Sequence, residues 1–143
     1  MQARELMTTD PAWCTPESTV RDAAELMRLR DCGCIPVLER DSRRLVGVVT
    51  DRDITVRGVA SGMVPQEARV STVMTADVRW CSESDSVQQA MDLMGEAQVR
   101  RLAVLDDNRK IVGVVSLGDL ATRQSAHTDA TLREISEHAP TAP

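Results

Sequence analysis

The sequence contains no Phe and no Tyr, and only two Trp among its 143 residues. The core must therefore be built from aliphatic side chains and Met. Proteins that bind single strands by stacking bases on aromatic rings depend on residues that are scarce here. Acidic residues number 22 against 17 basic ones, which gives a net charge of −5. Without a basic stripe, binding to nucleic acid or to anionic membranes is not expected.

Long hydrophobic runs are also missing. No apolar stretch approaches the roughly 20 residues that a membrane-spanning helix needs. The first seven residues, MQARELM, lack the apolar segment of a signal peptide. We therefore predict a cytoplasmic protein with no membrane association.

Cysteine is sparse, with Cys14, Cys32, Cys34 and Cys81 and no C-x-x-C pair, and the two His lie near the C-terminus. This pattern does not predict a zinc site. In a cytosolic chain the simplest interpretation is small buried thiols. A thiol-based redox sensor at Cys32 and Cys34 is an alternative, and it requires an exposed thiol with a lowered pKa.

The clearest feature that is present is an internal duplication with an offset of 67 residues. Met7-Thr8 and Trp13-Cys14 correspond to Met74-Thr75 and Trp80-Cys81. The register continues through Val20/Val87, Ala23/Ala90, Met27/Met94 and Val37/Val104. After one residue is dropped near 43–44, it resumes with Gly47/Gly113, Val49/Val115 and Asp53/Asp119.

Each repeat predicts the same elements. Polar clusters at 15–18 and 82–85 are typical of helix N-caps. An amphipathic helix follows, with predicted buried positions Val20, Ala23, Ala24 and Met27 in the first repeat and Val87, Ala90, Met91 and Met94 in the second. Gly33 is predicted to end the first helix in a left-handed conformation. A hairpin comes next, with strands near 34–38 and 45–50 and near 101–105 and 111–116, and a short helix follows it.

The repeats divide the chain into four parts. We assign residues 1–62 to the first repeat with its lead-in, 63–70 to a connection, 71–125 to the second repeat, and 126–143 to a polar tail with one weak helical turn at 132–135. A repeat of about 55 residues has a marginal core when alone. We therefore predict a mixed α/β (α+β) fold in which the two repeats pack around a pseudo-twofold axis.

The most informative stretch ends each repeat: Gly47-Val48-Val49-Thr50 with Asp53, and Gly113-Val114-Val115-Ser116 with Asp119. A buried strand runs into a helix start, where free N–H groups favour phosphate. The hydroxyl adds a donor, and the acid can accept both hydroxyls of a ribose. Arg52, Arg100 and Arg101 are the nearest cations for phosphate. The same spacing also forms a capping box, in which the acid serves the backbone alone, and both interpretations stay open.

Together these motifs resemble a CBS domain pair, or Bateman module, over residues 4–125. The residues that carry the resemblance are Met-Thr near each repeat start and the Gly-Val-Val-Thr/Ser-x-x-Asp ending. The resemblance implies a βαββα unit per repeat and a homodimer that forms a flat disc. It also implies an adenosyl ligand (AMP, ADP, ATP or S-adenosylmethionine) in up to two clefts between the repeats.

By position, the resemblance implies that Asp53 and Asp119 hold ribose and that Thr50, Ser116 and Arg52 lie at phosphate. Adenine contacts would come from the opposite repeat, namely Cys32-Gly33 for the Asp119 cleft and Val99-Arg100 for the Asp53 cleft. No catalytic residue, metal ligand set or required cofactor is indicated. We predict a non-enzymatic regulatory module that signals to an effector protein in trans. The alternative is an interaction or scaffold protein with degenerate sites.

Overall fold

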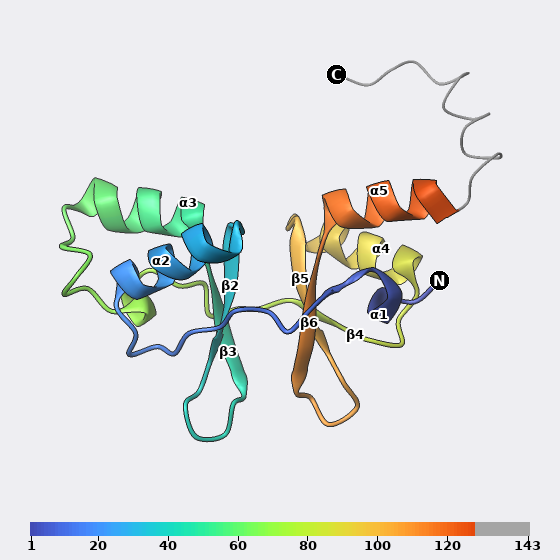
Figure 1. Ribbon diagram of the computed structural model, residues 1–143, viewed down its shortest axis with the longest axis horizontal. Coiled ribbons are helices and arrows are strands. Elements are labelled where there is room, and N and C mark those ends of the chain that lie inside the picture. The colour runs from blue at the N-terminus through green and yellow to red at the C-terminus, as the bar shows by residue number, and fades with distance from the viewer. Residues whose placement is uncertain (128–143) are drawn as a thin grey trace, which may run out of the picture.

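Two lobes of the same build lie side by side in the computed structural model, which describes residues 1–127 and the side chains of residues 1–122 (Figure 1). The first lobe contains α2 (Val20–Arg30), β2 (Cys34–Leu38), β3 (Leu45–Thr50) and α3 (Asp51–Asp53), which continues through a π-helical turn at Ile54–Gly58 and a 3₁₀ turn at Val59–Ser61. The second lobe contains α4 (Val87–Ala97), β5 (Arg101–Leu105), β6 (Ile111–Ser116) and α5 (Leu117–His127). The predicted mixed α/β repeats are confirmed. The helical turn predicted at 132–135 lies outside the described residues.

Capping residues fix where the long helices begin. The Thr19 hydroxyl accepts a hydrogen bond from the Asp22 N–H at 3.1 Å, and the Asp22 carboxylate accepts one from the Thr19 N–H at 3.2 Å. Ser86 and Gln89 repeat this capping box at the start of α4. Val20, Ala23 and Met27 are buried as predicted.

Three details of the predicted helices are wrong. The N-caps are Thr19 and Ser86, each one residue after the polar cluster expected to cap the helix. Ala24 is exposed, because the buried stripe of α2 passes through i, i+3 and i+7 and leaves Ala24 on its flank. The left-handed residue that ends α2 is Asp31, with φ of 50°, and not Gly33. The Cys32 N–H reaches back to the Met27 carbonyl at 3.0 Å, so the left-handed position must come directly after the last helical residue.

The two hairpins have matching registers. In the first, β2 and β3 pair antiparallel, with Cys34 opposite Thr50. In the second, β5 and β6 pair antiparallel, with Arg101 opposite Ser116. Both registers shift at the same place, after Val37 in one and Val104 in the other. The duplication seen in the sequence is therefore a duplication of strand register.

Two crossing segments, residues 7–14 and 74–81, join the lobes. The first begins as β1 (Thr8–Thr9), which pairs antiparallel with β6, and ends at Cys14, which pairs with Val37 of β2. The second begins at Thr75, which pairs with Val48 of β3, and leads into β4 (Trp80–Ser82), which pairs parallel with β5. Each segment thus contributes a strand contact to both lobes (Figure 1).

The residues before each crossing segment also pack on the opposite lobe. Helix α1 (Ala3–Leu6) precedes the first repeat in the chain, but Ala3 and Leu6 lie in the core of the second lobe with Leu102, Val115 and Leu120. The 3₁₀ turn at Val70–Thr72 precedes the second repeat, and its Val70 lies in the first core with Val73, Ile35 and Val49. The lead-in, which we grouped with the first repeat by its order in the chain, therefore packs with the second lobe.

The glycine of each repeat ending lies where a crossing segment presses on the strand. A Cβ at Gly113 would be 2.8 Å from the carbonyl oxygen of Thr8 and 2.6 Å from the sulfur of Met7. A Cβ at Gly47 would be 2.9 Å from the carbonyl oxygen of Thr75. Only glycine allows this approach, which is the physical reason for the residue in both repeats.

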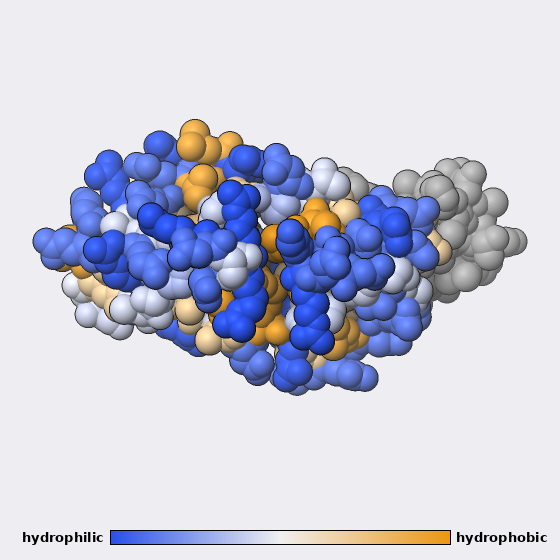
Figure 2. All heavy atoms as spheres, turned by 90° about the horizontal axis from the view of Figure 1, so that it is seen from below, coloured by the Kyte–Doolittle hydropathy of each residue, from blue (hydrophilic) through white to orange (hydrophobic). Residues whose placement is uncertain are grey.

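A furrow runs along the waist between the lobes. Figure 2, the view from below, shows apolar residues on its floor and hydrophilic residues along both edges. No helix in the described part of the chain is long and apolar enough to cross a membrane.

Candidate functional site

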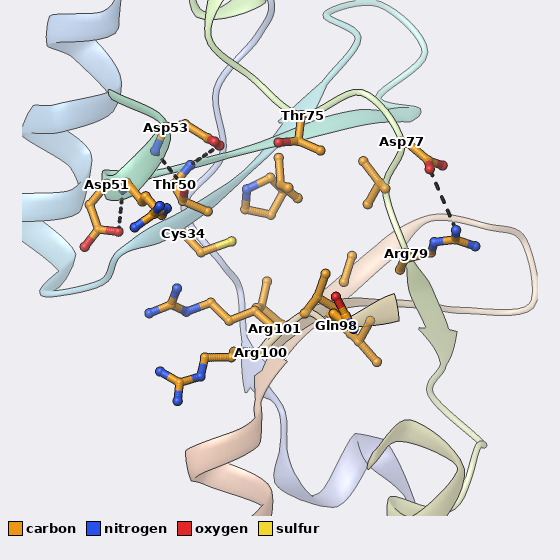
Figure 3. A pocket seen from close by; sticks show the side chains of 18 residues that line it. Cys34, Thr50, Asp51, Asp53, Thr75, Asp77, Arg79, Gln98, Arg100 and Arg101 are labelled. Carbon is orange, nitrogen blue, oxygen red and sulfur yellow. Dashed lines mark hydrogen bonds and ion pairs between the residues drawn. The ribbon is translucent and has the colours of Figure 1, made fainter. Parts of the chain in front are cut away.

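A cleft of about 420 Å³ opens at the waist where β3 ends. One wall comes from the first lobe and carries Thr50, Arg52 and Asp53 (Figure 3). The other wall comes from the start of β5 and the residues before it, Gln98 to Ala103. The second crossing segment closes one end with Thr75, Asp77, Val78 and Arg79. We call this the Asp53 cleft.

The Thr50–Asp53 pair forms a complete capping box. The Asp53 N–H donates to the Thr50 hydroxyl at 3.0 Å, and the Thr50 N–H donates to Oδ2 of Asp53 at 3.1 Å. Figure 3 draws both bonds. The capping box, one of the two interpretations of this motif, is therefore present. Within the described residues Oδ1 of Asp53 accepts no hydrogen bond, so the cap uses one carboxylate oxygen and leaves the other for a ligand.

A second cleft of about 430 Å³ lies where β6 ends. Ser116 and Asp119 come from the second lobe, and Asp31 to Cys34 come from the first lobe. The Asp119 N–H donates to the Ser116 hydroxyl at 3.0 Å. The first crossing segment contributes Thr8 and residues 10–12. We call this the Asp119 cleft.

The two clefts are built from equivalent positions and share a wall. Cys34, Arg101 and Val114 line both of them. The loops before β2 and β5 are held in the same way, because the Gly33 carbonyl accepts from the Asp51 N–H at 3.0 Å and the Arg100 carbonyl accepts from the Leu117 N–H at 2.8 Å. Any change in the position of the shared wall therefore affects both clefts.

Gly33 lies between Asp51 of its own lobe and Arg101 of the other lobe. A Cβ there would be 2.8 Å from Oδ2 of Asp51 and 3.3 Å from a guanidinium nitrogen of Arg101. A larger residue would displace both side chains. Close packing, and not a left-handed backbone, favours glycine at position 33, although the atoms nearby are the ends of two flexible side chains.

The thiols have different environments. Burial raises the pKa of Cys14 to about 12 and that of Cys81 to about 11, with smaller contributions from Asp22 and Asp85. These two cysteines are buried, as predicted. Burial likewise raises the pKa of Cys34 to about 11, although Arg101 opposes the shift. Cys32 is exposed. A redox sensor needs a lowered pKa, so Cys34 does not fit that alternative.

The structure gathers the residues singled out in the sequence into two groups. Those near the Asp53 cleft are Thr50, Arg52, Asp53, Val99 and Arg100, and those near the Asp119 cleft are Cys32, Gly33, Ser116 and Asp119. The sequence interpretation missed the crossing segments as cleft walls, because residues 8–12 and 75–79 were matched as the starts of the two repeats and given no role in a cleft. Their signal was the exact correspondence of Thr8 with Thr75 and of Asp10 with Asp77 across the duplication.

Comparison with known proteins places the repeats in a family. The family model for the CBS domain matches residues 3–58 and 70–126. YlbB of Bacillus subtilis is 38% identical over 136 residues, which cover 94% of this chain and 90% of that protein. Hypoxic response protein 1 of Mycobacterium tuberculosis is 33% identical over 125 residues, covering 87% of this chain and 86% of that protein.

Solved structures agree with this fold. The crystal structure of Hypoxic Response Protein I with two coordinated zinc ions superposes with a TM-score of 0.76 at 32% identity, over 85% of this chain and 98% of that one. The crystal structure of CBSX2 in complex with AMP superposes with a TM-score of 0.73 at 25% identity, over 89% of this chain and 98% of that one.

Proposed function

This chain belongs to the CBS domain family, and we propose that it is a regulatory module that binds an adenosyl ligand at its waist and signals to a partner protein. The observation that carries the proposal is that each cleft combines a hydroxyl and an acid from one lobe with a loop from the other. A relative of the same fold, CBSX2, was solved in complex with AMP.

The Asp53 cleft supplies the groups that such a ligand needs. The free oxygen of Asp53 can accept the ribose hydroxyls, as an acid does in dinucleotide-binding folds. Val78, Val99 and Ala103 line the cleft with apolar surface for the adenine ring. Arg52 and Arg100 offer planar donors that suit phosphate.

Binding between the lobes suggests how a signal arises. A ligand that contacts both walls stabilises one relative position of the lobes, and it shifts that equilibrium only by its difference in affinity for the two positions. We propose that an effector protein in the cytoplasm reads this shift, with AMP, ADP, ATP or S-adenosylmethionine as candidate ligands. The proposal includes no catalytic step.

We also propose that two copies pair through helical surface. Leu29, Val56 and Val59 are 74%, 51% and 62% exposed on α2 and the helical run after β3. A contiguous exposed apolar patch is typical of an association surface, and we propose that these side chains contribute to one. Val59→Asp is expected to convert a dimer into a monomer in sedimentation velocity, with an unchanged circular dichroism spectrum. A wild-type protein that sediments as a monomer at high concentration would refute the pairing.

Thermal unfolding with and without ligand tests the binding proposal. At 100 times its dissociation constant, a ligand stabilises the native state by about 2.7 kcal/mol, which raises the midpoint by several degrees for a chain of this size. We expect an adenine ligand to give this shift and a guanine nucleotide to give none. Asp53→Ala or Asp119→Ala should abolish the shift for the cleft concerned.

Asp22→Ala is the matched control for Asp53→Ala. Both acids close a Thr-x-x-Asp capping box, and replacing either by Ala removes the carboxylate that accepts from the Thr N–H, a loss of one hydrogen bond that costs about 1 kcal/mol. Both variants should therefore unfold at a somewhat lower temperature, but only Asp22→Ala should keep the full ligand shift. If no adenosyl ligand shifts the wild type, or if Asp53→Ala and Asp119→Ala both retain a full shift, the chain is better explained as a scaffold whose acids act only as caps.

A further inference from the structure

The two clefts have equivalent walls but different charges. Four arginines line the Asp53 cleft, and the residue at each equivalent position of the other repeat is uncharged. The pairs are Arg52 and Gly118, Arg79 and Ala12, Arg100 and Gly33, and Arg101 and Cys34. In the opposite direction, Asp31 of the Asp119 cleft stands where the Asp53 cleft has Gln98.

The net balance of charge changes sign between the clefts. The Asp53 cleft has four arginines against three carboxylates, those of Asp51, Asp53 and Asp77. The Asp119 cleft has two arginines, Arg30 and Arg101, against three carboxylates, those of Asp10, Asp31 and Asp119. One of its two arginines belongs to the shared wall, and the other is turned to the Asp10 carbonyl at 3.3 Å.

We infer that the two clefts take different ligands: the Asp53 cleft takes a nucleoside phosphate, and the Asp119 cleft takes a nucleoside whose 5′ substituent is uncharged or cationic. This inference rests on the proposed function, since it divides the adenosyl ligands between the two clefts. The ribose acid is common to both clefts, so ribose recognition does not separate them. The separation comes from the residues around the 5′ position.

Electrostatics explains the separation. In the Asp53 cleft a phosphate can pair with Arg52 and Arg100, which line the same cleft as Thr50. In the Asp119 cleft a phosphate would face three carboxylates in a partly enclosed space, where like charges repel more strongly than in bulk water. Arg101 cannot serve two phosphates at once, because it lies on the wall between the clefts. A neutral or cationic 5′ group avoids this repulsion.

The difference in charge between the clefts can be reduced by a substitution at position 118. Gly118 is the counterpart of Arg52, and a Cβ there would find no atom closer than Ser116 Oγ at 4.0 Å. The Cβ of Gly118→Arg therefore fits without displacing another segment of the chain. Gly33, the counterpart of Arg100, has no such room, because Asp51 and Arg101 lie against it.

Isothermal titration of the full chain with AMP and with adenosine tests the inference, since these probes differ only in the phosphate. We expect Asp53→Ala to weaken AMP binding at least tenfold, while adenosine still binds the Asp119 cleft. Asp119→Ala should leave the AMP site unchanged. Adding Gly118→Arg to Asp53→Ala should restore AMP affinity by about tenfold, the value of one charge-assisted contact, with little change for adenosine.

Arg52→Ala combined with Arg100→Ala provides an independent variant if Gly118→Arg proves unstable. It should lower the affinity for AMP at least tenfold and leave adenosine binding nearly unchanged. If AMP binds both clefts equally, or if AMP binding is lost in Asp119→Ala and not in Asp53→Ala, the inference that the clefts take different ligands is overturned. The proposed function survives either outcome. If neither AMP nor adenosine binds the wild type, the proposed function fails and the inference fails with it.

Discussion

Adding one methyl group at Gly113 should destabilise the protein, whereas adding one at Gly95 should stabilise it. Gly113 lies in β6 directly under the first crossing segment, and its Cβ would be 2.8 Å from the Thr8 carbonyl oxygen. That oxygen belongs to a paired strand and cannot move without breaking the pairing. Gly95 lies inside α4, and a Cβ there would meet nothing within 4 Å.

The magnitudes follow from two opposing terms. Overpacking of a well-filled site costs about 1–3 kcal/mol, and replacing glycine recovers about 0.4–1 kcal/mol by restricting the unfolded chain. Gly113→Ala should therefore lower the free energy of unfolding by about 1–2 kcal/mol, or the midpoint of thermal unfolding by roughly 3–7 °C. Gly95→Ala should gain about 0.5–1 kcal/mol, because alanine is the better helix former.

Urea denaturation followed by circular dichroism measures both changes. Gly47→Ala serves as an internal repeat of the experiment, since its Cβ would be 2.9 Å from the Thr75 carbonyl oxygen in the equivalent place. We expect the free energy of unfolding to fall by a similar amount in Gly113→Ala and Gly47→Ala and to rise in Gly95→Ala. Wild-type stability in Gly113→Ala would refute the argument that the crossing segments require glycine beneath them.

Three further predictions concern the thiols and the core. Burial raises the pKa of Cys14 to about 12, whereas the thiol of the unfolded chain has an ordinary pKa of about 8.5. Between these values the native thiol stays protonated and the unfolded thiol ionises. The contribution of the buried thiol to stability is therefore complete below about pH 8.5 and is lost as the pH rises towards 12. Cys14→Ala should therefore flatten the decline of stability, measured by urea denaturation, between pH 8.5 and 10.5, and an unchanged slope would contradict this. A thiol reagent added to native protein should modify Cys32 quickly and Cys81 only after unfolding. Mass spectrometry of the labelled peptides gives the order in which the thiols react. Early modification of Cys81 would exclude its buried position. Leu120 is fully buried in the second core, so Leu120→Ala should cost about 2–5 kcal/mol in urea denaturation, and a loss below 1 kcal/mol would show that α5 is loosely packed.

Local patterns in the sequence were sufficient for the elements and for the duplication. Valine-rich runs ending in Thr50 and Ser116 indicate strands, and the spacing of Val20, Ala23 and Met27 indicates a helix with one buried face. These features depend on neighbours in the chain. The residues on each side of the clefts could be assigned by position because the second repeat provides a copy of the first.

Long-range packing could not be predicted from those patterns. Nothing near Thr8 indicates that it pairs with β6, since its partner lies at the opposite end of the described chain. The prediction for Gly33 failed for a related reason. Glycine there looked like a helix cap, but the residue faces Asp51 and Arg101, and the latter comes from the other repeat. The contribution of residues 75–79 to the Asp53 cleft was hidden in the same way.

The crossing segments also determine when the fold can form during synthesis. The hairpin of β2 and β3 leaves the ribosome before Thr75, so the outer edge of β3 has no partner until the second segment arrives. The first segment in turn waits for β6, which is made after the whole first repeat. Such high contact order slows folding and couples both sheets into one cooperative event. A ribosome-bound fragment ending at residue 70 is therefore expected to expose an open sheet edge, and release of the complete second repeat closes both sheets together.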